Sequence, residues 1–226
     1  MTNTPLLPNR HPESDLFILD VGDVVLKDDL ASMEHPVFSL SKKPDITGKL
    51  YEHNGNSLEV TPSIKGLANI YDKDILIFAI SHIIAAKNKG KEYSKNVVFD
   101  AHDFLVFSNR HTGGRDYKLL KDALERLAGT RIVTNIKTNN ERIVEGFGLI
   151  DKFRVRTTLD DGTIMSWRVT LSDWLFNAIE ANEVLSINSD YFRLRKPLER
   201  RVYEIARKHC GLKKHWSINT IWNTIK

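Results

Sequence analysis

The fold is decided by residues 109–130, which read NRHTGGRDYKLLKDALERLAGT. A polar turn with two glycines opens this stretch, and the pattern after it predicts a helix from Arg115 to Leu127, with Gly129 as its C-terminal stop. Apolar residues recur at spacings of three and four and form one stripe: Tyr117, Leu120, Leu124 and Leu127. The opposite face is charged. A polar turn followed by a basic amphipathic helix is typical of the second half of a helix-turn-helix.

The elements on the N-terminal side of this stretch fit the same motif. A helix is predicted over Lys73–Asn88 with Asp72 as its N-cap, then a strand over Asn96–Phe99, then a helix over Ala101–Phe107 with Asp100 as its cap. The first of these helices is apolar on nearly every side. We therefore expect it either to lie at the centre of the core or to be shared with a partner.

A hairpin is predicted directly after the 115–127 helix. Two β-branched runs, 131–138 and 142–157, are joined by a pair of asparagines, and a strand over 163–170 and a helix over 173–181 follow. The order helix, strand, helix, turn, helix, hairpin predicts an α+β fold, a winged helix-turn-helix domain over residues 61–190. In this interpretation the hairpin is the wing.

The two ends of the chain read differently from this central unit. Residues 1–60 contain five prolines and predict an irregular N-terminal extension, with short strands around Leu16–Leu19, Leu50–His53 and Leu58–Thr61. Residues 191–226 predict the start of a second winged helix, because helix, strand and helix are expected again.

The second unit is expected to be incomplete. Its elements are a helix over Pro197–Cys210, a strand over His215–Ile218 and a helix from Thr220 that is still in helical period at the last residue. This indicates a truncated second winged helix, cut before its recognition helix. The alternative is a closed domain that ends in an ordinary helix.

The positive charge is concentrated in two segments. Residues 110–142 hold eight Lys or Arg against four Asp or Glu, and residues 193–226 hold ten against two, whereas residues 1–60 hold five against ten. Separate basic segments favour separate phosphate-contacting surfaces. Basic helices also occur in proteins that bind no nucleic acid, so a dimerisation module is an open alternative.

The helix-turn-helix interpretation assigns candidate contacts to double-stranded DNA. The N-terminal residues of the last helix approach base edges, and glycines there let backbone N–H groups come close to a phosphate. Arg115 is placed to pair with guanine, and cations on the hairpin suit the DNA backbone or a minor groove. The candidate DNA-binding residues are Arg110, His111, Thr112, Gly113, Gly114, Arg115, Lys118, Lys121, Arg131, Lys137, Arg142, Arg193, Arg195, Arg200, Arg201, Lys213 and Lys214.

Catalytic, metal and cofactor sites are not expected. Cys210 is the only cysteine, which excludes an internal disulfide and a cysteine-based zinc site. No two histidines lie within four residues of each other, and neither Gly48-Lys49 nor Gly90-Lys91 has the earlier glycine of a phosphate-binding loop. With no apolar run long enough to cross a membrane and none resembling a signal peptide, the sequence predicts a cytoplasmic protein without a membrane partner.

Four stretches carry a resemblance to a known family. They are GLANIYDKDILIF (66–78), TGGRDYKLL (112–120), LERLAGT (124–130) and PLERRVYEIARKHCG (197–211). On these stretches the chain resembles the replication initiator protein A family of bacterial plasmids. The resemblance implies two tandem winged helices that recognise repeated double-stranded DNA sites at a plasmid origin and help to open it for host replication proteins.

The resemblance also implies a homodimer in equilibrium with a monomer, usually through the first winged helix, and main base contacts from the second. Two other functions stay open at the level of sequence, because one fold supports several roles. A winged-helix transcription regulator or autorepressor would bind one palindromic site, whereas an initiator would occupy direct repeats. A dimerisation fragment of an initiator would ignore DNA.

Overall fold

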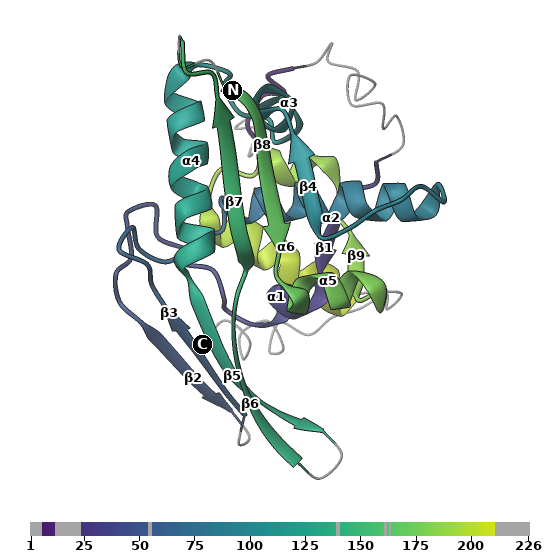
Figure 1. The fold of residues 1–226 in the computed structure, drawn as a ribbon. Coiled ribbons are helices and arrows are strands. Elements are labelled where there is room, and N and C mark those ends of the chain that lie inside the picture. The colour runs from purple at the N-terminus through teal and green to yellow at the C-terminus, as the bar shows by residue number, and fades with distance from the viewer. Residues whose placement is uncertain are drawn as a thin grey trace, which may run out of the picture.

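The computed structural model describes residues 6–11, 24–53, 56–138, 141–160, 162 and 164–210, which form a mixed α/β fold (Figure 1). In chain order the elements are β1 (Lys27–Asp29), α1 (Leu30–Glu34), β2 (Lys49–His53), β3 (Asn56–Thr61), α2 (Lys73–Asn88), β4 (Asn96–Phe99), α3 (Ala101–Phe107), α4 (Gly114–Gly129), β5 (Arg131–Thr138), β6 (Glu141–Gly148), β7 (Ile150–Thr157), β8 (Ile164–Leu171), α5 (Asp173–Glu180), β9 (Val184–Ser186), the 3-10 helix η2 (Ser189–Arg193) and α6 (Pro197–Cys210). In this part of the chain no helix is both long enough and apolar enough to cross a bilayer.

A helix-turn-helix with a three-stranded antiparallel sheet forms the centre of the molecule. The sheet has the strand order β4-β8-β7, and α2, α3 and α4 precede its second and third strands in the chain. Apart from β5 and β6, which are inserted between α4 and β7, the order helix, strand, two helices and two-stranded hairpin matches that of a winged helix. The wing is the β7–β8 hairpin.

The wing therefore differs from the sequence prediction, which placed it directly after α4. The strands that follow α4, β5 and β6, pair with each other and then with β3 and β2 in a separate four-stranded sheet, which extends away from the helices (Figure 1). The predicted second run, 142–157, is split at Leu149 between two sheets. Leu149 and Ile150 are buried there, and a continuous β-branched pattern gives no sign of the break.

The N-terminal segment is part of the fold rather than an irregular extension. β1 pairs with β9, and β3 pairs with β5, so both strands have partners at least 70 positions away in the sequence. The strands predicted near residues 50–53 and 58–61 are present as β2 and β3. The strand predicted at Leu16–Leu19 lies outside the described residues. The pairing of β3 with β5 crosses residue 60, where the sequence predicts the end of the N-terminal extension.

Helix α2 lies at the centre of the core. Ile75, Leu76, Ile77 and Ile80 have no exposed surface, and the ring of Phe78 contacts the rings of three further phenylalanines from β4 and α3. This explains why the helix is apolar on nearly every side. Of the two expectations for it, burial at the centre is the one observed.

Two helix ends differ from the capping prediction because the residues concerned make tertiary contacts. Asp72 makes no capping bond to α2; its carboxylate instead accepts two hydrogen bonds of 2.7 Å from Arg126 near the end of α4. Burial raises the pKa of Asp72, and the Arg126 guanidinium opposes that shift. Gly129 is the last residue of α4, and a Cβ there would lie 2.4 Å from the Cβ of Ser63. The glycine is required by close packing.

Candidate nucleic-acid interface

The amino end of α4 is open to solvent. Gly113 precedes the helix in an extended conformation, and a Cβ at Gly113 or Gly114 would meet no atom within 4 Å. Arg115, Lys118 and Lys121 are exposed along the first two turns. The positive end of the helix dipole therefore lies beside exposed Arg115, with Lys118 and Lys121 one and two turns farther along, which suits a phosphate.

Two acidic residues on the outer face of α4 share one cation from another segment. Lys65 Nζ lies 3.2 Å from Asp122 Oδ1 and 3.3 Å from Glu125 Oε2. Asp116, at the amino end, is half-buried. The charge that α4 presents to solvent is therefore positive at its amino end and close to balanced farther along.

A groove of about 810 Å³ lies beside the amino half of α4 and brings the two basic segments of the sequence together. Arg110 and His111 line it from the loop before α4, and Arg195 lines it from the segment before α6. Arg10, Lys42 and Lys43 also line it, and sequence reasoning missed these three. Arg126, Arg200 and four aspartates make up the rest of its charged lining.

Contacts across the groove join segments distant in sequence. Arg10 Nε donates to the Asn109 carbonyl at 3.1 Å, and its Nη1 lies 2.7 Å from His111 Nε2. Lys42 Nζ donates to the Arg195 carbonyl at 3.5 Å. No charge pattern along the sequence predicts this convergence, because the segments meet only through the tertiary fold.

The wing carries a second group of cations that sequence reasoning missed. Lys152, Arg154 and Arg156 are exposed at alternate positions of β7, so they share one face of the sheet. Exposed Arg168 lies opposite Arg154 on β8. Phe153 and Val155, between them, pack against the core. The alternation K-F-R-V-R at 152–156 is the local signal for this face, and the sequence prediction includes it in a longer strand over 142–157.

These wing cations are not neutralised by the residues around them. Among the residues that the structure describes, none of the four has a carboxylate within ion-pair distance, and the nearby Asp151 pairs with Lys95 at 2.9 Å. In Figure 1 the end of β7 and the amino end of α4 lie on the same side of the molecule. The two cationic groups can therefore face one ligand.

Two of the candidate residues are not at the surface. Arg200 and Arg201 are 3% and 6% exposed, and they bind Asp74 and the carbonyls of Ser32 and Met33. Their assignment to DNA binding is corrected: a guanidinium that is buried and paired inside the fold cannot reach a phosphate.

Other candidates are partly engaged inside the protein. Arg110 Nη2 lies 2.8 Å from Asp74 Oδ2, and Arg193 Nη1 lies 2.8 Å from Asp190 Oδ1. Arg131 Nη2 donates to the Gly146 carbonyl at 2.7 Å within the four-stranded sheet. These three cations stabilise the fold through intramolecular contacts, which a ligand would have to share or replace.

The remaining candidate residues fall into three groups: two exposed residues, two residues on the β5–β6 hairpin, and two outside the described residues. Thr112 and Arg195 are exposed, the first at the start of α4 and the second at the groove. Lys137 and Arg142 lie opposite each other in register on β5 and β6, away from the β7–β8 wing. Lys213 and Lys214, together with the strand and helix expected after residue 211, lie outside the described residues.

The site offers charge and hydrogen-bond donors rather than reactive groups. Within the described ranges, no cluster of three or more His, Cys, Asp or Glu side chains could hold a metal ion. Exposed arginines, lysines and helix-terminal N–H groups bind phosphate and base edges. The geometry is that of a binding surface for a polyanion.

Comparison with known proteins identifies similar chains. Residues 27–222 match the family model described as "Replication initiator protein A". A curated protein of Wigglesworthia glossinidia brevipalpis, described by its name as a replication protein, is 40% identical over 213 residues, which cover 91% of this chain and 76% of that protein.

Two crystal structures of domains 2 and 3 of RctB share the fold. One has a TM-score of 0.56 over 84% of this chain and 73% of that chain, and the other has a TM-score of 0.52 over 80% and 69%. Sequence identity is 12% in both. The likeness is therefore one of architecture.

Proposed function

Since the chain belongs to the replication initiator protein A family, we propose that it initiates plasmid replication by binding repeated double-stranded DNA sites at the origin. The observation that supports this most is the cationic surface formed by the amino end of α4 and the β7–β8 wing. Its arginines and lysines are exposed and uncompensated by carboxylates of the described residues. The affinity of such a surface for DNA falls with salt, and the slope of log affinity against log salt is proportional to the number of phosphates neutralised.

The binding mode follows from helix geometry. In the proposed complex the amino end of α4 enters the major groove, where Arg115 pairs with a guanine and Lys118 contacts the backbone. Arg154 and Arg156 on the wing contact the flanking phosphates. Lys42 and Lys43, at the groove beside α4, extend the contact along the backbone on the other side.

The proposal includes a second winged helix, a homodimer in equilibrium with a monomer, and host replication proteins as further partners. The family supports these features, and the second winged helix would begin near α6. Sedimentation of the protein with and without origin DNA measures the monomer–dimer equilibrium directly. A single species at every protein concentration, unchanged by DNA, would contradict the proposed equilibrium.

Footprinting on the parent replicon tests the main proposal. An initiator protects several direct repeats, and its affinity for them falls steeply with salt. Protection of one palindromic site would favour a transcription regulator or autorepressor instead. No protection at low salt would support a dimerisation fragment.

No catalytic step is part of the proposal. Supercoiled origin plasmid incubated with the protein and a divalent metal ion should stay supercoiled. Nicking of that plasmid, absent with an unrelated plasmid, would show that the protein is an enzyme.

A further inference from the structure

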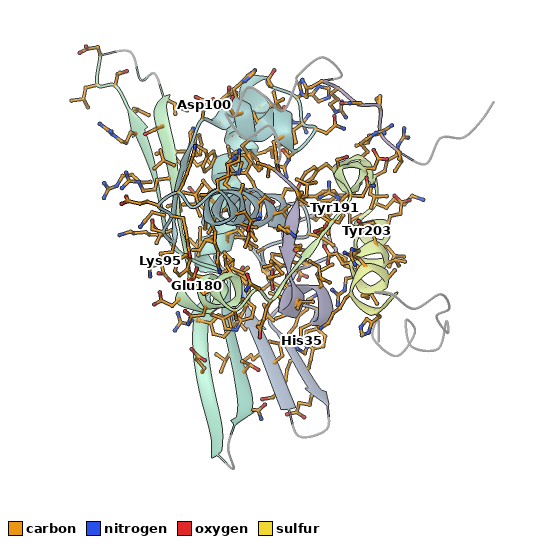
Figure 2. The ribbon with its side chains drawn as sticks, turned by 90° about the vertical axis from the view of Figure 1, so that its right-hand side faces the viewer. His35, Lys95, Asp100, Glu180, Tyr191 and Tyr203 are labelled. Atoms are coloured by element: carbon orange, nitrogen blue, oxygen red, sulfur yellow. The ribbon has the colours of Figure 1, made fainter. Side chains whose placement is uncertain are left out.

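Helix α6 packs on the rest of the molecule mainly through charged groups. Arg200, Arg201 and Glu204 are buried with Ile205, whereas Leu198 on the same helix is 53% exposed. In Figure 2 the label of Tyr203 marks α6, and the label of Tyr191 marks η2 beside it. Buried ion pairs contribute little net stability compared with apolar packing but require one defined geometry. A helix held in this way can leave at a smaller cost than one held by apolar side chains.

The first point of attachment is Arg200. Its Nη1 lies 2.6 Å from Asp74 Oδ1, and its guanidinium lies over the rings of Tyr71 and Tyr191, at 4.6 and 4.9 Å from their centres. The other oxygen of Asp74 binds Arg110, in the loop before α4. One carboxylate therefore anchors both α6 and the loop that opens the DNA-binding helix.

The second point of attachment is Glu204, which joins α6 to α2 and η2. Its Oε1 lies 3.2 Å from Lys73 Nζ and accepts a hydrogen bond of 2.5 Å from the Tyr191 hydroxyl. Lys73 Nζ also lies 2.6 Å from Asp28 Oδ2 on β1, at an angle outside ordinary hydrogen-bond geometry. Arg201 lies 3.6 Å from the other oxygen of Glu204.

The charges in this second cluster do not balance. Three buried carboxyl groups, Asp28, Asp29 and Glu204, face two buried cations, Lys73 and Arg201. Asp29 is occupied as the N-cap of α1, where it accepts hydrogen bonds from Ser32. An unbalanced negative charge is costly in a buried site, so one proton on a carboxyl group restores neutrality.

Asp28 is the group that holds this proton. The pKa of Asp28 is raised to about 8: burial is the main cause, Lys73 opposes it, and Glu204 and Asp29 add to it. Burial raises the pKa of the Tyr191 hydroxyl as well, so that hydroxyl remains a donor to Glu204.

We propose that α6 is a detachable helix whose docking on β1 and α2 takes up one proton, and that its release changes where the chain beyond residue 210 leaves the winged helix. The docked state holds one proton more than the released state, in which solvated Asp28 ionises. Docking therefore weakens as pH rises from the ordinary Asp value of 3.8 to about 8 and is constant above that. The docking constant falls by up to about tenfold per pH unit in this interval.

Amide hydrogen exchange on the full chain tests the proposal. The protection of α6, corrected for intrinsic exchange and expressed relative to α4, should fall as pH rises from about 6 to about 8 and then level off. Asp28→Asn removes the titrating carboxyl group and should remove most of the pH slope, whereas His209→Asn, which removes the imidazole on α6, should leave that slope in place. The matched control is Asp173→Asn, an exposed carboxyl group that pairs with Lys95 and should leave the wild-type slope unchanged.

Should the Asp28→Asn protein not fold, Glu204→Gln provides a second test: with one buried carboxyl group fewer, the pKa of Asp28 is raised less, and the pH slope should be smaller. A reduced pH slope in either variant supports the proposal. A flat profile for α6 in the wild type, or an undiminished slope in the folded variant, overturns it.

Discussion

Helices α4 and α6 are both basic and amphipathic, yet their cations have opposite fates. Arg115 and Lys118 of α4 are exposed, whereas Arg200 and Arg201 of α6 are buried. The difference comes from carboxylates supplied by distant segments. Asp74 lies 126 positions before its partner Arg200 and draws the side chain inward. The number of cations along a helix therefore predicts its charge but not whether those cations face solvent or are buried in the protein.

The same principle acts in the opposite sense on the acidic residues of α4. Asp122 and Glu125 would oppose a phosphate, but Lys65 from a separate turn pairs with both. One helix thus presents positive charge because its acids are compensated from elsewhere. Helix α6 presents little positive charge because carboxylates of other segments pair with its arginines.

The largest effect should come from the buried side of this comparison. Arg200→Ala leaves Asp74 with Arg110 alone and opens space between two tyrosine rings, so we expect the free energy of unfolding to fall by about 3–5 kcal/mol. Urea unfolding measures it. Lys196→Ala, an exposed neighbour, should change it by less than about 0.5 kcal/mol. If the Arg200→Ala protein keeps its stability but binds DNA more weakly, then Arg200 contacts DNA.

A smaller effect should come from the exposed side. Arg115→Ala should weaken binding to the cognate repeat by about 1–3 kcal/mol if it removes a guanine contact, with no loss of folding stability. Fluorescence anisotropy with cognate and scrambled duplexes measures the difference. Lys89→Ala, just beyond α2, is the matched control. Equal cognate affinity in the Arg115 variant and the wild type would remove α4 from the interface.

The smallest expected effect is on the salt dependence of DNA binding, and it distinguishes the β7–β8 hairpin from the β5–β6 hairpin as the DNA contact. Replacing Arg154 and Arg156 together by alanine should weaken binding to all sequences alike and lower the salt slope of binding by about 2. Lys137→Ala tests the hairpin directly after α4, which the sequence predicted as the wing. If the Lys137 variant lowers the slope and the Arg154/Arg156 variant does not, then the β5–β6 hairpin is the DNA contact.

Local signals in the sequence were sufficient for most helices and strands. The bounds of α2, β4, α3 and α6 agree with their predictions, because caps, periodicity and glycine positions act within a few residues. The winged helix follows from their order. The inserted sheet did not, because the pairing of β3 with β5 joins residues 58–61 to residues 131–134 and leaves no local trace.

The candidate site was predicted only where it is local. The amino end of α4 needs one turn and one helix, and both are visible in residues 109–130. The groove needs Arg10, Lys42 and Arg195 to meet across the fold, and the burial of Arg200 needs Asp74. Long-range electrostatics is therefore the part of this site that residue patterns miss.

Arginine-selective chemical modification, mapped by mass spectrometry with and without the cognate repeat, tests the central claim most directly. Arg115, Arg154 and Arg156 should react in the free protein and be protected by DNA, while Arg200 and Arg201 should resist modification in both states. Equal reactivity of Arg115, Arg154 and Arg156 with and without bound DNA would contradict the account.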